Sequence, residues 1–216
     1  MKKFAVVLAG CGVFDGAEIH EATLTLLSLA QQGAHYELFA PDINQHHVVN
    51  HLNGNEMPEK RNVLVEAARI ARGNIKALGE LHASSFDAII LPGGFGVAKN
   101  LCDFAFKGFD CQVNSQLAKI LIDFHNEHKP IGALCISPVI LASIFQKVTI
   151  TIGQDENTIS NIEKMGSTHL KTNHGEVVID EANKLFTTPC YMLDANILQI
   201  YEGTTNIVAA MLKSMD

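Results

Sequence analysis

Three features are missing from the sequence, and each absence excludes a class of protein. The five cysteines are odd in number and scattered, and no two of them form a Cys-x-x-Cys pair, so neither a zinc knuckle nor a disulfide framework is indicated. Cysteines that stay free are typical of reducing compartments, and we therefore expect a cytoplasmic protein. Basic residues form no stripe, and the formal net charge is −7. This charge argues against nucleic acid or an anionic membrane surface as a partner.

Long apolar runs are the third absence. The stretch at residues 4–9 faintly resembles the core of a signal peptide, but it is too short and passes directly into a loop with an acidic residue. It is instead typical of a first β-strand. The sequence also lacks internal repeats, low-complexity tracts and linkers, and its 216 residues suit one α/β domain with a large core. We expect a single domain over residues 1–216 that does not enter a membrane.

Short apolar runs alternate with amphipathic stretches along the chain. Strands are expected at residues 4–9, 36–40, 86–91, 131–134, 148–152, 177–179 and 185–188. Helices are expected from an Asp15–Glu18 capping pair to residue 32, and at 62–76, 112–125, 138–145, 155–165 and, interrupted near Gly203, 190–211. This alternation predicts a three-layer, doubly wound, mostly parallel α/β sheet. The functional site of such a sheet lies beyond the carboxyl ends of its strands, where loops 10–16, 92–96 and 135–138 should meet.

Cys135 lies at a predicted corner between a strand and a helix. Ser137 is a suitable N-cap and Pro138 suits the first helical position, because its missing N–H would be unpaired there. A side chain on such a corner projects above the sheet edge, and the helix N-terminus lowers the pKa of a thiol there. These features indicate a nucleophile. The alternative is a small buried cysteine that ends a core strand.

Two backbone N–H groups are candidate donors to an oxyanion beside this thiol. The N–H of Ile136 follows the corner directly, and the N–H of Gly94 belongs to the turn at residues 92–96. A glycine lets the backbone approach a substrate closely. The alternative for this turn is an ordinary tight connection after a strand.

Glu21 is the candidate partner of the thiol. Glu18 has a sufficient structural task in the capping pair, whereas Glu21, one turn later, has none. A carboxyl buried beside a thiol should have a raised pKa, and its neutral form could donate a hydrogen bond to the thiolate. The alternative is a solvent-exposed glutamate on the helix surface.

No histidine stands where a base for Cys135 would be expected, because Ile136 occupies the next position. His174-Gly175-Glu176 resembles the His-x-Glu pair of class I glutamine amidotransferases, but two candidate strands follow it here, so a loop histidine is the favoured interpretation. A second group of histidines, at positions 46, 47 and 51, lies in a polar stretch with no carboxylate at ligand spacing. It is interpreted as surface, and no metal or cofactor is expected.

Residues 90–101 together with 133–138 resemble the ThiJ/PfpI superfamily, which has a class I glutamine-amidotransferase-like, flavodoxin-like fold. The glutamate that stands twelve residues before the glycine closing the first helix in that superfamily falls on Glu21, counted from Gly33. The segments at residues 10–21, 62–73 and 187–192 are similar to the ElbB subfamily, a glyoxalase III-like group associated with isoprenoid biosynthesis in bacteria, with mitochondrial relatives. The resemblance covers essentially the whole chain.

The resemblance implies a cofactor-free glyoxalase that converts glyoxal or methylglyoxal to glycolate or lactate. Cys135 would add to the aldehyde, Glu21 would shuttle protons, and the N–H groups of Gly94 and Ile136 would hold the oxyanion. Relatives are often homodimers. Several of them carry a histidine right after the cysteine or on the next strand, where this chain has Ile136 and residues 151–153. A slow enzyme is therefore expected, and the alternative function is a non-enzymatic cysteine redox sensor or regulatory binding protein.

Overall fold

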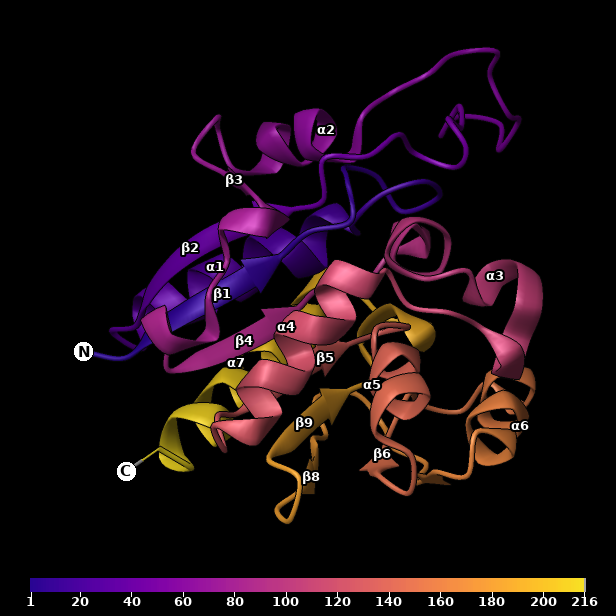
Figure 1. Ribbon diagram of the computed structural model, residues 1–216. Helices are drawn as coiled ribbons and strands as arrows, with labels where there is room; N and C mark the ends of the chain where they lie inside the picture. Colours follow the sequence, from indigo (N-terminus) through magenta and orange to yellow (C-terminus); the bar gives the residue numbers. More distant parts are fainter. Residues whose placement is uncertain (216) are drawn as a thin grey trace.

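A seven-stranded sheet runs through the middle of the computed structural model, which describes residues 1–215 (Figure 1). The strands lie in the order β3-β2-β1-β4-β5-β9-β8, and every neighbouring pair is parallel except β8 and β9. They are β1 (Lys3–Val7), β2 (His35–Ala40), β3 (Lys76–Ala77), β4 (Ala88–Leu91), β5 (Ile131–Leu134), β8 (Val178–Asp180) and β9 (Leu185–Thr188). The last residue of the domain expected over 1–216 lies outside the described residues.

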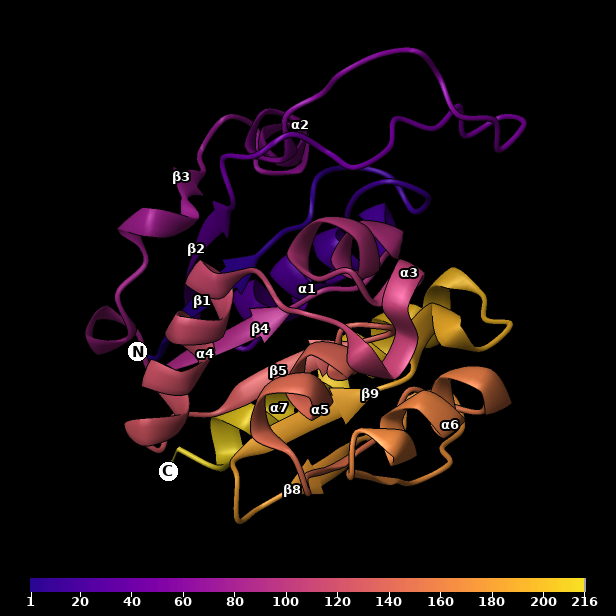
Figure 2. The same ribbon diagram turned by 45° about the vertical axis from the view of Figure 1, so that its right-hand side comes forward.

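Helices cover both faces of this sheet, as Figures 1 and 2 show. They are α1 (Ile19–Gln31), α2 (Val63–Ile70), α3 (Phe104–Lys107), α4 (Ser115–Asn126), α5 (Pro138–Phe145), α6 (Glu156–Lys164) and α7 (Ile197–Lys213). Alternate residues of β1 enter two separate cores: Ala5 and Val7 pack on the side of α4 and α5, and Phe4 and Val6 pack on the side of α1 and α7. The predicted three-layer, mostly parallel α/β fold is confirmed. Within residues 1–215 no helix is long and apolar enough to cross a bilayer.

Some element boundaries differ from those that the sequence predicts. The strand expected at 148–152 is β6 (Thr149–Ile150), which pairs with β7 (Thr168–His169) in a separate two-stranded sheet. The last helix is not interrupted at Gly203. A Cβ on that residue would lie 3.4 Å from Thr188 Oγ1 and 3.5 Å from Cys190 Sγ. This glycine therefore allows α7 to pack closely on the end of β9 instead of breaking the helix.

The three predicted loops meet at the carboxyl edge of the sheet. The N–H of Gly96 donates to the carbonyl of Gly16 at 2.9 Å, and a Cβ on Gly96 would lie 2.6 Å from the same carbonyl carbon. Ser137 is not the side-chain cap that its position suggests. Its buried hydroxyl donates to the carbonyl of Pro92 at 2.9 Å and so joins the loop after β5 to the loop after β4. Backbone contact between the loops leaves room only for glycine at their crossing.

Candidate functional site

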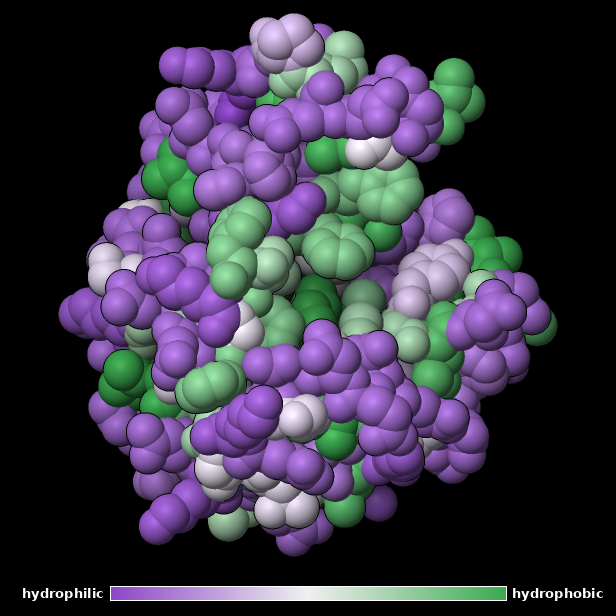
Figure 3. Space-filling model, turned by 90° about the vertical axis from the view of Figure 1, so that its right-hand side faces the viewer, coloured by the Kyte–Doolittle hydropathy of each residue, from purple (hydrophilic) through white to green (hydrophobic). Residues whose placement is uncertain are grey.

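A cavity of about 560 Å³ opens at this edge of the sheet. Figure 3 looks onto the edge and shows a hollow surrounded by hydrophobic side chains. Cys135 and Ile136 reach the cavity from the end of β5, Gly94 from the turn after β4, and Glu18 from the residue before α1. Its other walls are formed by residues 13, 95, 98, 104–106, 108, 155, 157, 158, 161, 191 and 192. Three of the four predicted site residues therefore line one cavity.

Cys135 occupies a strained corner directly after β5. Its φ is +58°, a left-handed conformation that costs free energy for any residue with a side chain. The side chain is 7 % exposed, and its N–H donates to the carbonyl of Thr188 at 3.0 Å. The predicted corner is thus present, and the surrounding structure holds the sulfur at the floor of the cavity.

Glu21, the fourth predicted residue, lies directly behind this sulfur. It is completely buried and in hydrogen-bond contact with the Cys135 thiol. The N–H of Gly93 donates to its Oε2 at 2.9 Å, and the N–H of Tyr191 donates to its Oε1 at 3.1 Å. Burial and the nearby charge of Glu18 raise the pKa of Glu21 to about 8, so the carboxyl is mostly protonated at neutral pH. A solvent-exposed helix glutamate is excluded.

The pKa of the Cys135 thiol moves in the opposite direction from the one predicted. Burial raises it well above its ordinary value and the charge of Glu21 adds to this, while the N–H groups of Gly94 and Ile136 lower it. The prediction considered the helix N-terminus alone, whereas removal of water from the sulfur is the larger effect. In the resting site Cys135 and Glu21 are therefore a neutral thiol beside a neutral acid.

Several contacts around this pair were not predicted from the sequence. Gly93 and Tyr191 hold the Glu21 carboxyl, and Tyr191 also binds the ring of His20 through its hydroxyl at 2.8 Å. Glu18 is the N-cap of α1, because its Oε2 accepts from the N–H of Glu21 at 2.7 Å, and it also lines the cavity. The predicted capping pair of Asp15 and Glu18 is wrong, since Asp15 Oδ2 accepts from the N–H of Val49 at 2.7 Å and Glu18 itself is the N-cap. In the sequence, the double glycine at 93–94 and the motif at 187–192 are the features from which these contacts could have been predicted.

In the part of the chain that the structure describes, no histidine lines the cavity. His174 lies in a turn before β8, and both β8 and β9 follow it, as expected. The residues directly after β9 are Pro189 and Cys190, so the amidotransferase His-x-Glu pair is missing from that place. His46 packs on the ring of Phe106, with 4.2 Å between ring centroids. No group of three side chains able to hold a metal is found within residues 1–215.

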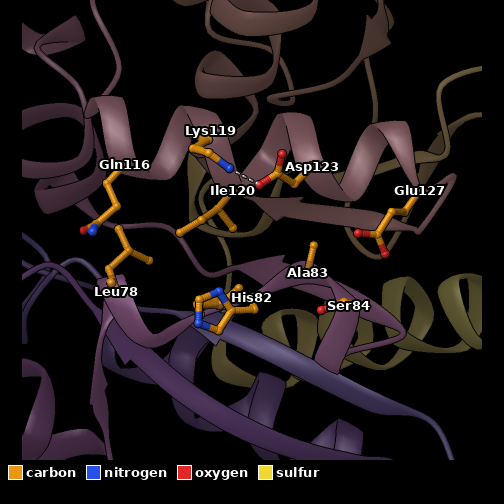
Figure 4. Close-up of a pocket in the computed structure, with 11 residues that line it drawn as sticks. Leu78, His82, Ala83, Ser84, Gln116, Lys119, Ile120, Asp123 and Glu127 are labelled. Carbon is orange, nitrogen blue, oxygen red and sulfur yellow. Dashed lines mark hydrogen bonds and ion pairs between the residues drawn. The ribbon is translucent and has the colours of Figure 1, made fainter.

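A second cavity, of about 330 Å³, shares no lining residue with the first (Figure 4). One wall is α4, and the other is formed by two single turns, η1 (Leu78–Glu80) and η2 (Ala83–Ser85). Its charged groups are already paired, because Lys119 Nζ lies 2.6 Å from Asp123 Oδ2. None of its lining residues is a cysteine or has a positive φ, and the cavity at the strand ends is the stronger candidate site.

Comparisons with known proteins give relatives over nearly the whole chain. The chain is 42 % identical over 223 residues to the ES1 protein homolog, mitochondrial, of Rattus norvegicus, covering 99 % of this chain and 82 % of the relative. It is also 42 % identical over 221 residues to the human glutamine amidotransferase-like class 1 domain-containing protein 3, mitochondrial, covering 98 % and 82 %. The crystal structure of an isoprenoid biosynthesis protein with an amidotransferase-like domain from Ehrlichia chaffeensis superposes with a TM-score of 0.94 at 37 % identity, covering both chains completely.

The names of these relatives correct one expectation. Both curated relatives are named as mitochondrial proteins, which contradicts the cytoplasmic location inferred from the free cysteines. Free cysteines report a reducing environment and do not distinguish one reducing compartment from another. The resemblance to the ElbB group, by contrast, is confirmed by the Ehrlichia structure. The model of the DJ-1/PfpI family matches residues 11–188. The chain therefore belongs to the DJ-1/PfpI family.

Proposed function

We propose that this protein is a cofactor-independent glyoxalase that converts 2-oxoaldehydes to 2-hydroxy acids. The observation that supports it best is the neutral pair formed by Cys135 and Glu21 at the floor of an apolar cavity. A thiol adds to an aldehyde without a metal or organic cofactor, provided that an acid–base group moves its proton. Glu21, with a pKa of about 8, is close to the working pH and suits this task.

The proposed reaction begins when the sulfur of Cys135 attacks the aldehyde carbon. The thiol proton passes to the new alkoxide by way of Glu21, giving a hemithioacetal, and the N–H groups of Gly94 and Ile136 stabilise the oxyanion in passing. A proton then leaves the former aldehyde carbon and returns to the neighbouring carbonyl carbon through an enediol, which gives a thioester. Water cleaves the thioester and restores the thiol, so one oxoaldehyde and one water yield one hydroxy acid.

The transfer of a proton between the two carbons needs a group that faces the substrate. Glu21 is completely buried behind the sulfur and does not line the cavity, whereas Glu18 lines the cavity itself. We therefore assign the thiol proton to Glu21 and the carbon-bound proton to Glu18. Neither is a histidine, and without an imidazole base we expect slow turnover.

Glyoxal consumption by the purified protein, without glutathione or added metal, tests the proposal. Wild type should form glycolate, and Cys135→Ala and Glu21→Gln should each lower the rate by about 10²-fold or more, because each removes a group that takes part in the first step. Matched controls are Cys11→Ala, a thiol outside the cavity, and Glu66→Gln, a buried carboxylate on α2. Equal rates in Cys135→Ala and wild type, or no product from wild type, would overturn the proposal.

The lining of the cavity predicts a preference among 2-oxoaldehydes. Phe104, Phe106 and Met192 lie along its walls, and the volume of about 560 Å³ far exceeds that of glyoxal. Burying an aromatic ring contributes about 1.5–3 kcal/mol, which corresponds to roughly 10- to 100-fold in affinity. We expect phenylglyoxal to have a kcat/KM at least about tenfold above that of glyoxal. A Phe106→Ser variant should reduce this ratio, and an unchanged ratio would exclude the wall as a specificity element.

A redox sensor based on Cys135 is less well supported. Peroxide reacts with thiolates, and burial keeps the Cys135 thiol protonated. The cavity therefore favours catalysis on a small molecule.

A further inference from the structure

Two cysteines outside the candidate site lie on paired segments of the chain, and their thiols influence each other's pKa. Cys102 follows the turn at Val97–Leu101, and Cys111 follows the single turn at Gly108–Asp110. The chain on either side is held together, because Cys102 forms an antiparallel bridge with Val113. Both thiols are free. Backbone pairing therefore places Cys111 two residues from the position opposite Cys102, without a covalent bond between the two cysteines.

The two thiols differ in their surroundings. Cys102 is buried, and its thiol donates to the carbonyl of Val97 at 3.3 Å. Cys111 is also buried, but it borders a shallow cavity of about 410 Å³ that also includes Ser143. The neighbouring Cys102 thiol is the main cause that lowers the pKa of Cys111 to about 7, against the opposing effect of burial, and the Ser143 hydroxyl donates to the Cys111 carbonyl at 3.3 Å. Cys111 therefore has a thiolate fraction at neutral pH, and Cys102 keeps its proton.

We propose that Cys102 and Cys111 form a peroxide-reactive dithiol, in which Cys111 is attacked first and Cys102 closes a disulfide. The Cys111 thiolate attacks one oxygen of the peroxide, and the O–O bond breaks. The other oxygen leaves as an alcohol, or as water when the peroxide is hydrogen peroxide. The sulfur is thereby oxidised to a sulfenic acid and the peroxide is reduced. The Cys102 thiol then attacks the sulfenic sulfur and releases water, so one peroxide converts two thiols to one disulfide.

Closure of this disulfide would act on one wall of the cavity at the strand ends. The segment that it closes, residues 102–111, contains α3, whose Phe104 and Phe106 line that cavity. A cross-link across this segment restricts its backbone. The proposal does not rest on the glyoxalase activity, and it can be tested without any substrate.

Peptide mapping after mild oxidation tests the pair. Trypsin cleavage after Lys99, Lys107 and Lys119 gives peptides 100–107 and 108–119, each with one of the two cysteines. After treatment with one equivalent of hydrogen peroxide at pH 7.5, we expect the folded protein to lose about 2 Da. The two peptides should appear linked, and reduction should separate them.

Single-serine variants assign the two roles. Cys102→Ser should leave Cys111 as a sulfenic or more oxidised acid, which a sulfenic-acid probe labels, whereas Cys111→Ser should leave Cys102 unmodified. Cys11→Ser, at a cysteine outside this pair, should form the link as wild type does. The proposal is overturned if wild type keeps both thiols free while other cysteines are oxidised, or if peptides 100–107 and 108–119 link to other cysteines instead of to each other. Peptide mapping of the wild-type protein tests the proposal without any variant, so a variant that fails to fold does not affect the test.

Discussion

Replacing Glu21 by Gln should remove most of a decline in stability that the wild-type protein shows between pH 5 and pH 8. The folded protein keeps a proton on Glu21 up to about pH 8, whereas the unfolded chain releases it near pH 4.5. Unfolding between these values therefore releases a proton. The contribution of Glu21 to stability is complete below about pH 4.5 and is lost as the pH rises towards 8, at about 1.36 kcal/mol per pH unit, or roughly 4 kcal/mol between pH 5 and pH 8.

Urea unfolding at pH 5, 6, 7 and 8 measures this slope. The comparison depends on the difference in slope between Glu21→Gln and wild type and not on the stability at one pH, because the amide leaves one of the N–H groups of Gly93 and Tyr191 without an acceptor. Thr25→Ser, which changes no ionisable group at another buried position of α1, is the control and should keep the wild-type slope. Parallel slopes for wild type and Glu21→Gln would show that Glu21 is ionised across this range.

Gly93→Ala is expected to be among the most damaging substitutions of a single methyl group in this protein. The new Cβ would lie 2.6 Å from Glu21 Oε2 and 2.9 Å from Cys135 Sγ, and closer still to the Cβ of Cys135. None of these atoms can move freely, because the carboxyl is held by two N–H groups and the cysteine by a strained backbone. We expect a loss of about 3 kcal/mol or more in unfolding free energy, at the upper end of overpacking effects.

Thermal and urea unfolding measure this loss, with Gly79→Ala as the control. A Cβ on Gly79 would lie 3.0 Å from Gln116 Nε2, which is the end of a flexible side chain and can rotate away. Its cost should stay below about 1 kcal/mol. If Gly93→Ala is as stable as Gly79→Ala, then the contact between the turn after β4 and Cys135 is looser than described, and the assignment of Gly94 as an oxyanion donor is weakened as well.

The alternation of apolar and amphipathic segments was sufficient to predict the layers, the direction of the sheet and the edge at which the site lies. Local rules also predicted the corner at Cys135 and the meeting of the three loops, because a parallel sheet always delivers the carboxyl ends of its strands to one edge. The last helix, which these rules predict to be interrupted near Gly203 and which is continuous there in the structure, shows their limit. Whether a glycine ends a helix or allows close packing depends on what lies against it, here Thr188 and Cys190.

The charge state of the site was decided by the tertiary structure. Burial of Glu21 between Gly93 and Tyr191 depends on residues 72 and 170 positions away, and only the folded chain brings them together. The pKa of Cys135 follows the same principle, since the local helix predicts a lower value and the loss of water around the sulfur raises it. The sequence by itself therefore determined the fold and the residues that meet at the strand ends. Protonation depends on all neighbours at once, so the tertiary structure alone decided which thiols are neutral and which, as at Cys111, are partly ionised at neutral pH.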